Sequence, residues 1–371
     1  MKISVLLPYK ENFAPNHAGA VSLFVHDMTQ ESIFKNDTYI FGNTDAKKKL
    51  SKNYTNLDLS KKIFQSKSKL YVKTFLKFEK NINSDLIEVH NRPNYINLIK
   101  NNFNKKIILY FHNDPLTMNG SKKKQERIDL LNNVDMIIFN SKWSKERFFI
   151  NLHNKSLLSK KTAVCYQSSS NVKVNFKNKQ KIISFVGKLN RAKGYDLFGN
   201  AIVRILNKHK DWKAIVFGDE PREKHFFKHK NLSILGFKKN KYILENLKKI
   251  SISVVCSRWN EPFGRTSLEA ASRGSAVIIS DRGGLPETAS NAIILKKLTV
   301  DHLYKTIDDL IKNNKKLLKL QKQNYSDFKF SHKYISSIID NIRKSFISNK
   351  YLYAFNIKKN NVLKILHITN F

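Results

Sequence analysis

Short apolar runs alternate with longer amphipathic stretches along the first half of the chain. The runs are rich in Ile, Val, Phe and Tyr, as expected of buried strands, and lie at residues 3–7, 38–41, 85–89, 107–111, 136–139 and 163–166. Between them, apolar residues recur at helical spacing at residues 21–32, 71–80 and 141–152. Strands that alternate with helices predict a parallel sheet covered by helices, the α/β class.

The same alternation restarts after a polar, lysine-rich stretch at residues 168–180, which predicts a linker. Further strands are predicted at residues 182–186, 212–217, 232–235, 252–255 and 276–279. Further helices are predicted at residues 194–208, 242–250, 264–273, 301–313 and 332–347. We therefore expect two Rossmann-like domains of similar size, with ligands bound by loops at the carboxyl ends of their strands.

Composition narrows the class of protein. Of the 371 residues 41% are hydrophobic, which is enough for folded cores and excludes a wholly disordered basic chain. The two cysteines, Cys165 and Cys256, are too few for a disulfide scaffold or a cysteine-rich zinc module and fit a reducing compartment. No apolar run approaches the roughly 18–20 residues that span a bilayer, and residues 3–7 are too few for a signal-peptide core. We expect a soluble, cytoplasmic protein.

The charge is strongly positive, with 68 basic and 29 acidic residues and a formal net charge of +39. Lysines run through the whole chain, so a compositional bias is favoured over a dedicated nucleic-acid surface. A basic polyanion- or nucleic-acid-binding protein without catalysis remains the alternative. Arginines are sparse, and four of the 11 lie close together in sequence: Arg258, Arg265, Arg273 and Arg282. This clustering indicates a place that needs planar, multidonor groups.

Several catalytic motifs are missing from the sequence. It has no G-x-G-x-x-G after a strand, no Walker A motif, no H-E-x-x-H and no G-x-S-x-G. It also has no Asp-x-Asp, the usual metal clamp of metal-dependent nucleotide-sugar transferases. We therefore assign no metal ligand.

The most informative stretch is residues 257–270, SRWNEPFGRTSLEA, which follows an apolar strand, turns at Pro262-Phe263-Gly264 and enters a helix. A helix N-terminus presents free N–H groups and a positive dipole end, which together form an anion site. Gly264 lets a ligand come close to the backbone. Glu261 and Glu269 flank this turn, so two carboxylates are available for the hydroxyl groups of a sugar and of a ribose.

This stretch resembles the E-x7-E signature of retaining glycosyltransferases with the GT-B fold, specifically family 4 (glycosyl transferases group 1). Residues 283–287, GGLPE, match that family's usual next loop. Residues 185–194, FVGKLNRAKG, resemble its diphosphate loop: Lys193 matches, and Lys188 replaces the usual Arg, which keeps the charge but loses the bidentate fork. The resemblance implies a GT-B fold, in which two Rossmann-like domains with parallel sheets face a cleft.

The resemblance also implies site residues. Glu269 would accept hydrogen bonds from the ribose, Glu261 would hold the sugar hydroxyls, and the backbone at Gly236 and Phe237 would face the base. The implied donor-binding set is Gly19, Lys188, Lys193, Gly236, Phe237, Glu261, Phe263, Gly264, Arg265 and Glu269. The implied catalytic set is His112, Glu261 and Lys193, with His112 near the transferred sugar. The acceptor-binding candidates are His90, Arg92, Asn113 and Asp114.

The function expected from the resemblance is retaining transfer of a hexosyl-type sugar from a UDP- or GDP-sugar to a glycan or lipid-linked acceptor. Surface polysaccharide or lipopolysaccharide synthesis is the expected context, without cofactor, metal or nucleic acid. Peripheral contact with the inner face of the cytoplasmic membrane is a further hypothesis, since lysines are attracted to anionic lipid.

Four segments are expected on this basis. Residues 1–168 would be an acceptor-binding domain and residues 169–331 a nucleotide-sugar-binding domain. Residues 332–350 would be a helix that crosses back to the first domain, and residues 351–371 a tail of unknown role. Because residues 361–371 read like the opening strand of a Rossmann domain, a truncated further domain stays open beside a simple tail strand or a disordered end.

Overall fold

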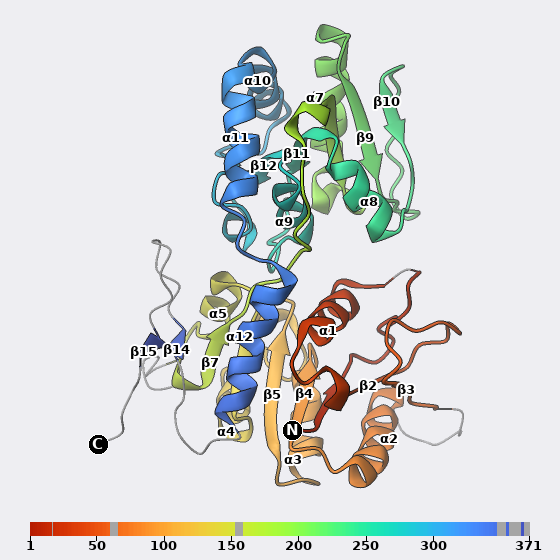
Figure 1. Ribbon diagram of the computed structural model, residues 1–371, viewed down its shortest axis with the longest axis vertical. Helices are drawn as coiled ribbons and strands as arrows, with labels where there is room; N and C mark the ends of the chain where they lie inside the picture. Colours follow the sequence, from red (N-terminus) through yellow and green to blue (C-terminus); the bar gives the residue numbers. More distant parts are fainter. Residues whose placement is uncertain (17, 60–65, 153–158, 347–353, 356–364, 367–371) are drawn as a thin grey trace. The chain divides into compact units, whose positions relative to one another are not determined.

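The structure is a computed structural model that describes residues 1–16, 18–59, 66–152, 159–346, 354–355 and 365–366. The chain forms two compact units, Met1–Gln167 together with His332–Phe371, and Ser168–Ser331 (Figure 1). The functional roles expected for the two domains stay predictions.

The first unit is built on a sheet of seven parallel strands in the order β3-β2-β1-β4-β5-β6-β7. The strands are β1 (Ile3–Leu6), β2 (Thr38–Gly42), β3 (Tyr54–Asn56), β4 (Leu86–His90), β5 (Lys106–Phe111), β6 (Met136–Phe139) and β7 (Thr162–Val164). The helices are α1 (Ala20–Glu31), α2 (Lys67–Ile82), α3 (Ile96–Lys100), α4 (Lys124–Asn133), α5 (Lys142–Phe148) and α12 (His332–Ser345).

Helices cover both faces of this sheet, which is why its strands are almost continuously apolar. Side chains such as Ile87, Leu109 and Ile137 form the core with α2, α3, α4 and α5. The alternate positions, among them Glu88 and Tyr110, face α1 and α12, which pack side by side (Figure 1).

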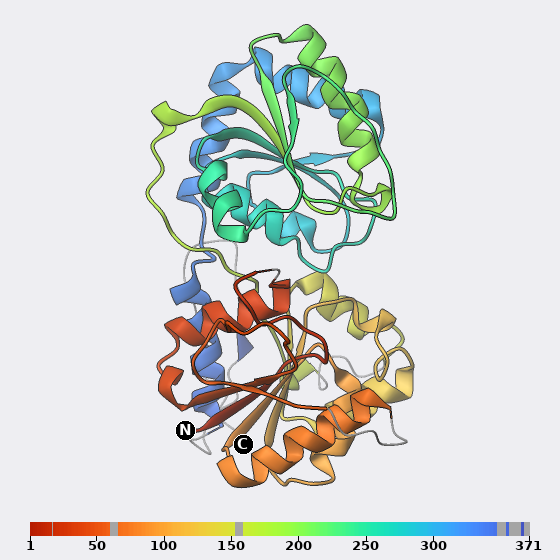
Figure 2. The same ribbon diagram turned by 90° about the vertical axis from the view of Figure 1, so that its right-hand side faces the viewer.

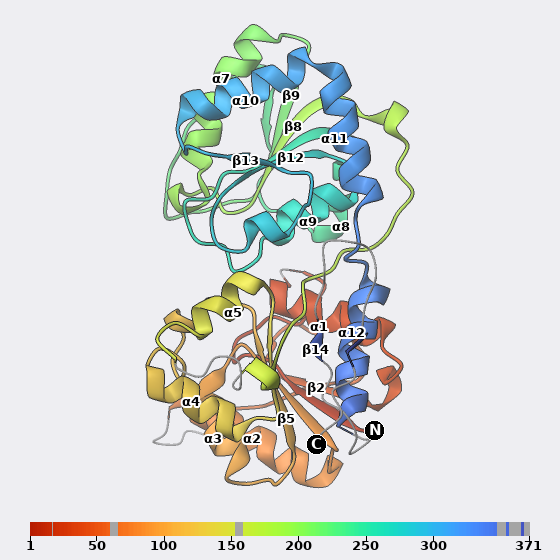
Figure 3. The ribbon, with the colours of Figure 1, turned by 90° about the vertical axis from the view of Figure 1, so that its left-hand side faces the viewer.

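The second unit contains six parallel strands in the order β10-β9-β8-β11-β12-β13 between two helical layers (Figures 2 and 3). The strands are β8 (Gln180–Val186), β9 (Lys213–Phe217), β10 (Leu232–Ile234), β11 (Ile250–Val255), β12 (Ala276–Ser280) and β13 (Ile293–Leu295). The helices are α7 (Tyr195–Lys208), α8 (Asn240–Leu247), α9 (Arg265–Ser272), α10 (Val300–Lys312) and α11 (Asn314–Ser326). One core joins α7, α10 and α11 to the sheet, and a second core joins α8 and α9 to its other face.

The α/β fold class predicted from the sequence is confirmed, with two departures in detail. The pattern missed the short edge strands β3 and β13 and the helices α3, α4 and α11. The stretch predicted as a linker is docked on the second unit: Ser169 is buried, its amide donates to Phe330 O (3.0 Å), and Arg273 Nη1 donates to Ser169 Oγ (2.8 Å). A serine-rich composition does not reveal such a contact, because the partners lie more than one hundred residues away.

The end of the chain is described only in part. Two short strands, β14 (Ala354–Phe355) and β15 (Ile365–Leu366), pair antiparallel. The rest of the predicted tail at residues 351–371, and the end of the segment predicted at residues 332–350, lie outside the described residues.

A buried ion pair between Glu88 and Arg343 joins α12 to the sheet of the first unit. Arg343 Nε and Nη2 each donate to a Glu88 carboxylate oxygen at 2.8 Å, and Nη1 donates to Asp340 and Ser32 at 3.1 Å. Tyr110 Oη donates to Glu88 at 3.1 Å. Burial alone lowers the pKa of Arg343, but the carboxylates of Glu88 and Asp340 raise it above its usual value, so the guanidinium stays charged.

Arg343→Met should destabilise the first unit strongly, because it leaves the Glu88 carboxylate buried without its cation. We expect its free energy of unfolding to fall by about 3–5 kcal/mol, measured by chemical denaturation. The control is Lys106→Met, which removes the partly exposed pair with Asp135 (2.9 Å) and should cost less than about 1 kcal/mol. Equal losses in the two variants would contradict the importance given to the buried pair.

Candidate functional site

Three loops at the carboxyl edge of the second unit's sheet are joined by backbone hydrogen bonds. The amides of Arg258 and Trp259, which follow β11, both donate to Ala192 O, in the loop after β8, at 2.9 and 3.0 Å. The amide of Gly284, which follows β12, donates to Glu261 O at 2.7 Å. The loops that the sequence identified as separate motifs therefore form one surface.

Two glycines permit this close approach. Gly194 has φ +75°, and a Cβ placed there would lie 2.0 Å from Cys256 O. Gly283 has φ +63°, and a Cβ there would lie 2.1 Å from Glu261 O. Both contacts are with backbone atoms, so a side chain at either position would push the loops apart.

Lys193 and Glu261, two of the three predicted catalytic residues, contact each other in this loop cluster. Lys193 Nζ lies 2.5 Å from Glu261 Oε1, and the two side chains are 33% and 11% exposed. Glu261 is thus buried, and its carboxylate contacts the more exposed Lys193. The pair offers a cation for a phosphate and an acceptor for hydroxyl groups in the same place.

Helix α9 begins beside this pair. Its N-cap, Gly264, has φ +115°, and no side chain caps the helix start. Phe263 is buried and fixes the turn, and a Cβ on Gly264 would lie 2.4 Å from Leu285 Cδ2. The helix N-terminus therefore adds positive dipole next to Lys193.

Glu269 is a buried residue of α9, inside the second unit. Its Oε1 accepts hydrogen bonds from Arg265 Nε (2.8 Å) and Asn240 Nδ2 (2.9 Å), and the side chain is buried. A ribose hydroxyl would share this oxygen or use the other one. Asn240 was missed by sequence reasoning, because nothing in the sequence links it to a residue 29 positions away.

Three of the four clustered arginines bind protein groups. Arg258 forms a bidentate pair with Asp196 (2.5 and 2.8 Å), Arg265 pairs with Glu269, and Arg273 binds the segment around Ser169. A role of the cluster toward an anion stays a prediction. Planar multidonor groups are used here to hold loops together.

Lys188, Gly236 and Phe237, three further residues of the predicted donor set, lie on loops at the same edge of the sheet. Lys188 follows Gly187 after β8 and is exposed. Gly236 follows β10 and accepts a hydrogen bond from the Gly218 amide (2.9 Å), and the neighbouring Phe237 is 45% exposed.

Acidic residues after β9 hold the Lys188–Lys193 loop, which sequence reasoning did not foresee. Glu223 Oε2 accepts from the Arg191 amide at 2.8 Å. Glu220 pairs with Arg222, and the hydrogen bond from that guanidinium is the main cause that lowers the pKa of Glu220 to about 2. The loop that carries the lysines is therefore braced by carboxylates.

Gly19 lies at the start of α1 in the first unit, where the sequence predicted a contact with donor phosphates. Glu11 Oε1 accepts from both the amide and the hydroxyl of Ser22 (3.1 Å each). A Cβ on Gly19 would lie 2.4 Å from that oxygen. In the structure the chain's own carboxylate occupies this helix start, so a phosphate there would compete with Glu11.

His90 and His112, at the carboxyl ends of β4 and β5, are buried together in the first unit, with His90 Nδ1 3.0 Å from His112 Nε2. Of the other acceptor candidates, Asp114 is held by Arg147 (3.0 and 3.1 Å) and Arg92 donates to Asn91 O. Asn113 is exposed. His90 has its ring in the interior, so it offers an acceptor no direct contact in this arrangement.

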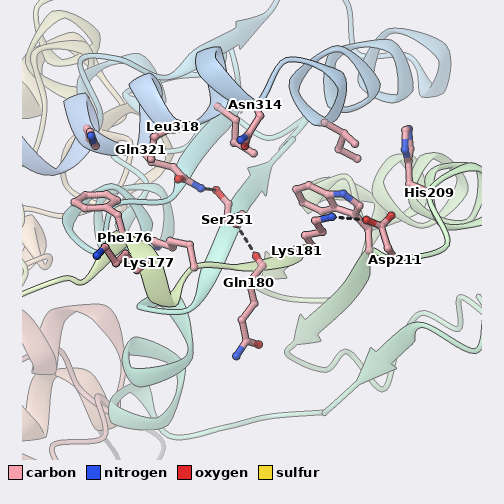
Figure 4. A pocket seen from close by; sticks show the side chains of 15 residues that line it. Phe176, Lys177, Gln180, Lys181, His209, Asp211, Ser251, Asn314, Leu318 and Gln321 are labelled. Carbon is pink, nitrogen blue, oxygen red and sulfur yellow. Dashed lines mark hydrogen bonds and ion pairs between the residues drawn. The ribbon is translucent and has the colours of Figure 1, made fainter.

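A separate pocket lies away from these residues. A pocket of about 700 Å³ opens at the amino edge of the second unit's sheet, where Gln180 begins β8. Figure 4 shows Ser251 hydrogen-bonded between Gln180 and Gln321, and Lys181 paired with Asp211. No residue of the predicted site lines this pocket.

The described ranges contain no group of three or more His, Cys, Asp or Glu side chains placed to hold a metal ion. None of their helices combines the length and the apolar character needed to cross a bilayer.

The fold class is that of the GT-B glycosyltransferases, two α/β units with parallel sheets of seven and six strands. Residues 167–327 match the family Glycosyl transferases group 1. This match covers the unit that contains Lys193, Glu261 and Glu269.

Curated relatives include a putative glycosyltransferase, YtcC, from Bacillus subtilis, 27% identical over 56% of this chain and 58% of its own length. The lipopolysaccharide core biosynthesis mannosyltransferase LpcC from Rhizobium leguminosarum bv. viciae is 30% identical over 29% of this chain and 33% of its own length. The chain thus spans about half the length, or less, of the curated relatives it matches.

Solved structures resemble the chain over most of its length. Anabaena HepE in complex with UDP and glucose has a TM-score of 0.71 at 16% identity and covers 93% of this chain and 100% of its own. Sucrose-phosphate synthase from Thermosynechococcus elongatus has a TM-score of 0.74 at 15% identity and covers 94% of this chain and 100% of its own. At these identities the likeness concerns the fold.

Gly283→Ala tests the close approach of the loops. The new Cβ would meet the backbone of Glu261, and we expect the second unit to lose roughly 2–4 kcal/mol of stability in chemical denaturation. Gly236→Ala is the matched control: Gly236 also has a positive φ, +67°, but no atom lies within 4 Å of its Cβ position. It should cost about 1 kcal/mol. Similar losses at both positions would mean that the loop contact carries little energy.

Proposed function

We propose that this chain is a retaining glycosyltransferase of family 4 that moves a hexosyl-type sugar from a nucleotide-sugar donor, a UDP- or GDP-sugar, to a glycan or lipid-linked acceptor. The observation that carries the proposal is the contact of Lys193 with Glu261 beside the uncapped start of α9. A cation, a hydroxyl acceptor and a helix N-terminus in one place suit a sugar attached to a diphosphate.

Charge development on the leaving group explains what these residues do. When the bond between sugar and diphosphate breaks, negative charge grows on the phosphate oxygens. Lys193, Lys188 and the amides from Phe263 to Arg265 stabilise that charge from fixed positions, which is electrostatic preorganisation without the need for a metal ion. We assign no protein nucleophile and no general base.

The remaining contacts set the position of the donor. Glu261 accepts hydrogen bonds from the sugar hydroxyls, and the diphosphate takes over part of its contact with Lys193. Glu269, held by Arg265 and Asn240, accepts from the ribose, while Gly236 and Phe237 face the base. A structural neighbour was solved in complex with UDP-glucose, which supports a nucleotide-sugar donor.

The first unit would bind the acceptor, with Arg92, Asn113 and Asp114 as candidate contacts and His112 near the transferred sugar. We place the reaction in surface polysaccharide or lipopolysaccharide synthesis at the cytoplasmic side of the membrane. The support is that one relative is named for lipopolysaccharide core biosynthesis.

Lys193→Ala and Glu261→Gln should each abolish sugar transfer while the fold survives. The unaltered chain should be stabilised against heat by one of a set of UDP-, GDP- and ADP-sugars, since a ligand that binds only the native state raises its stability. Lys193→Ala should lose this stabilisation because the diphosphate loses its cation. The control Lys181→Ala removes an exposed ion pair with Asp211 (2.6 Å) at the opposite edge of the sheet and should change neither readout.

Two results would contradict the proposal. Full transfer activity in the double variant of Lys193 and Glu261 would remove the site assignment. Absence of any nucleotide-sugar effect, together with nucleic-acid binding that falls linearly with the logarithm of salt concentration, would favour the alternative of a non-catalytic polyanion-binding protein.

Contact with an anionic membrane is proposed for the outer face of α2. Its exposed lysines are Lys67, Lys69, Lys77 and Lys80. The helix has one acidic residue, Glu79, which is buried and paired with Lys105 (2.7 Å), so it does not offset the lysines. Each lysine near an anionic surface contributes about 1 kcal/mol.

Replacing these four lysines with Gln should weaken flotation with vesicles of phosphatidylcholine and phosphatidylglycerol by about tenfold or more. The matched control makes the same change at four exposed lysines of α11, which are Lys315, Lys316, Lys319 and Lys322. Equal effects of the two replacements would mean that net charge alone matters. Equal flotation with neutral and anionic vesicles would remove the hypothesis.

A further inference from the structure

The rings of His90 and His112 form a hydrogen-bonded pair between the sheet and α1 of the first unit. Their facing nitrogens, His90 Nδ1 and His112 Nε2, lie 3.0 Å apart, and the ring planes differ by 17°. His90 stacks on Tyr110 with ring centres 4.3 Å apart and planes 8° apart. The edge of Phe24 packs against His112 at 5.1 Å. Neither ring has room to turn without moving its neighbours.

The surroundings keep both rings uncharged. Burial lowers the pKa of His90 to about 3, and the positive charge of Arg343 contributes in the same direction. Burial also lowers the pKa of His112 well below its usual value, with His90 as a second cause. The carboxylate of Glu88 does not raise these pKa values again, because it is held by Arg343 and by the Tyr110 hydroxyl. Two neutral imidazoles therefore share one proton along the 3.0 Å contact.

The backbone of His112 is fixed on both sides. Its amide donates to Asn91 Oδ1 (3.1 Å), and its carbonyl accepts from Asn140 Nδ2 (3.0 Å). The outer ring nitrogens, His90 Nε2 and His112 Nδ1, are shielded from solvent and have no hydrogen-bond partner in the described part of the chain. One of these two atoms carries a proton.

The places of the two outer nitrogens favour one arrangement of this proton. If His90 Nδ1–H donates to His112, then His90 Nε2 is a bare lone pair and His112 carries its proton on Nδ1. The reverse arrangement places an unpartnered N–H on His90 Nε2, in the interior beside α1 and α12. The first arrangement is therefore favoured, with the free N–H on the residue that directly follows the carboxyl end of β5, the edge at which such sheets bind ligands.

We propose that His90 is a positioning residue that holds His112 as a neutral Nδ1–H donor for a hydroxyl group of the transferred sugar. The inference rests on the proposed function and gives His90 a role behind the site rather than in contact with the acceptor. A buried N–H without a hydrogen-bond partner costs about 1–3 kcal/mol of free energy. A sugar hydroxyl that accepts from this N–H recovers that free energy, because water is excluded and cannot accept in its place.

Nitrogen NMR of the full chain with labelled histidine tests the tautomer directly. Long-range ¹H–¹⁵N spectra, assigned by comparison with His112→Gln, should show a protonated Nδ1 and an unprotonated Nε2 for His112, unchanged between pH 8 and 5. A proton on Nε2, or titration with an ordinary pKa near 6.5, would overturn the inference. This measurement needs no substrate and stands even if the proposed function fails.

Kinetics separate positioning from simple packing. His90→Phe keeps the stack on Tyr110 but removes the donor, and we expect kcat to fall about ten- to a hundredfold while the KM for the donor stays within about twofold. His90→Asn places an amide N–H near the position of Nδ1 and should restore most of kcat. Equal losses in the two variants, with equal thermal stability, would overturn the inference. A wild-type chain that neither binds nor uses any nucleotide sugar would contradict the proposed function, and the NMR result would still decide the tautomer.

Discussion

The contact between Glu88 and Arg343 is the interaction on which the first unit depends most. It joins the central strand β4 to α12, a helix from far along the sequence that also packs against α1. A buried ion pair adds little stability compared with a well-packed apolar pair, but removing one partner leaves an uncompensated charge and costs much stability. The pair therefore favours one position of α12 over others. Burial is the main cause that lowers the pKa of His90, and the charge of Arg343 acts in the same direction. The pair thus fixes the place of α12 and contributes to the neutral state of His90 behind His112.

In the second unit, backbone contacts between loops hold the site residues in place. Its site is assembled by backbone contacts between the loops after β8, β11 and β12, and glycines at 194 and 283 make those contacts possible. Side chains then brace the loops: Arg258 binds Asp196, and Glu223 binds the Arg191 amide. Lys193 and Glu261 pair with each other in the same cluster, with Lys193 the more exposed of the two.

The sequence predicted much of this architecture because parallel strands buried on both faces leave a strong apolar signal. The central strands were found within one or two residues, whereas the edge strands β3 and β13 were missed because three residues with mixed burial give no pattern. The sequence also brought together Lys193, Glu261 and α9, since each lies in a motif that follows a strand.

The partners of these residues could not be predicted. Asp196, Glu223 and Arg273 act on groups that are distant in the chain, and local pattern carries no information about such contacts. The same limit applies to the arginines: their clustering in sequence indicated a place that needs planar, multidonor groups but did not reveal that Arg258, Arg265 and Arg273 bind three separate protein groups. His90 was predicted to bind the acceptor for a similar reason. The end of a strand is a good position for a site residue, but only the packing of α1 and α12 decides which side of the sheet its ring faces.

The balance of charge explains why acidic residues mark the important places in this chain. With 68 basic residues against 29 acidic ones, a lysine at a given position carries little information. A carboxylate is scarce, and wherever one is buried it holds a particular cation or amide, as Glu88 holds Arg343, Glu269 holds Arg265 and Asp308 holds Lys208. Glu261 belongs to this set, and its partner Lys193, like Lys208 beside Asp308, is partly exposed. What sets the Lys193–Glu261 pair apart is its place among the joined loops, next to the start of α9, where no side chain caps the helix.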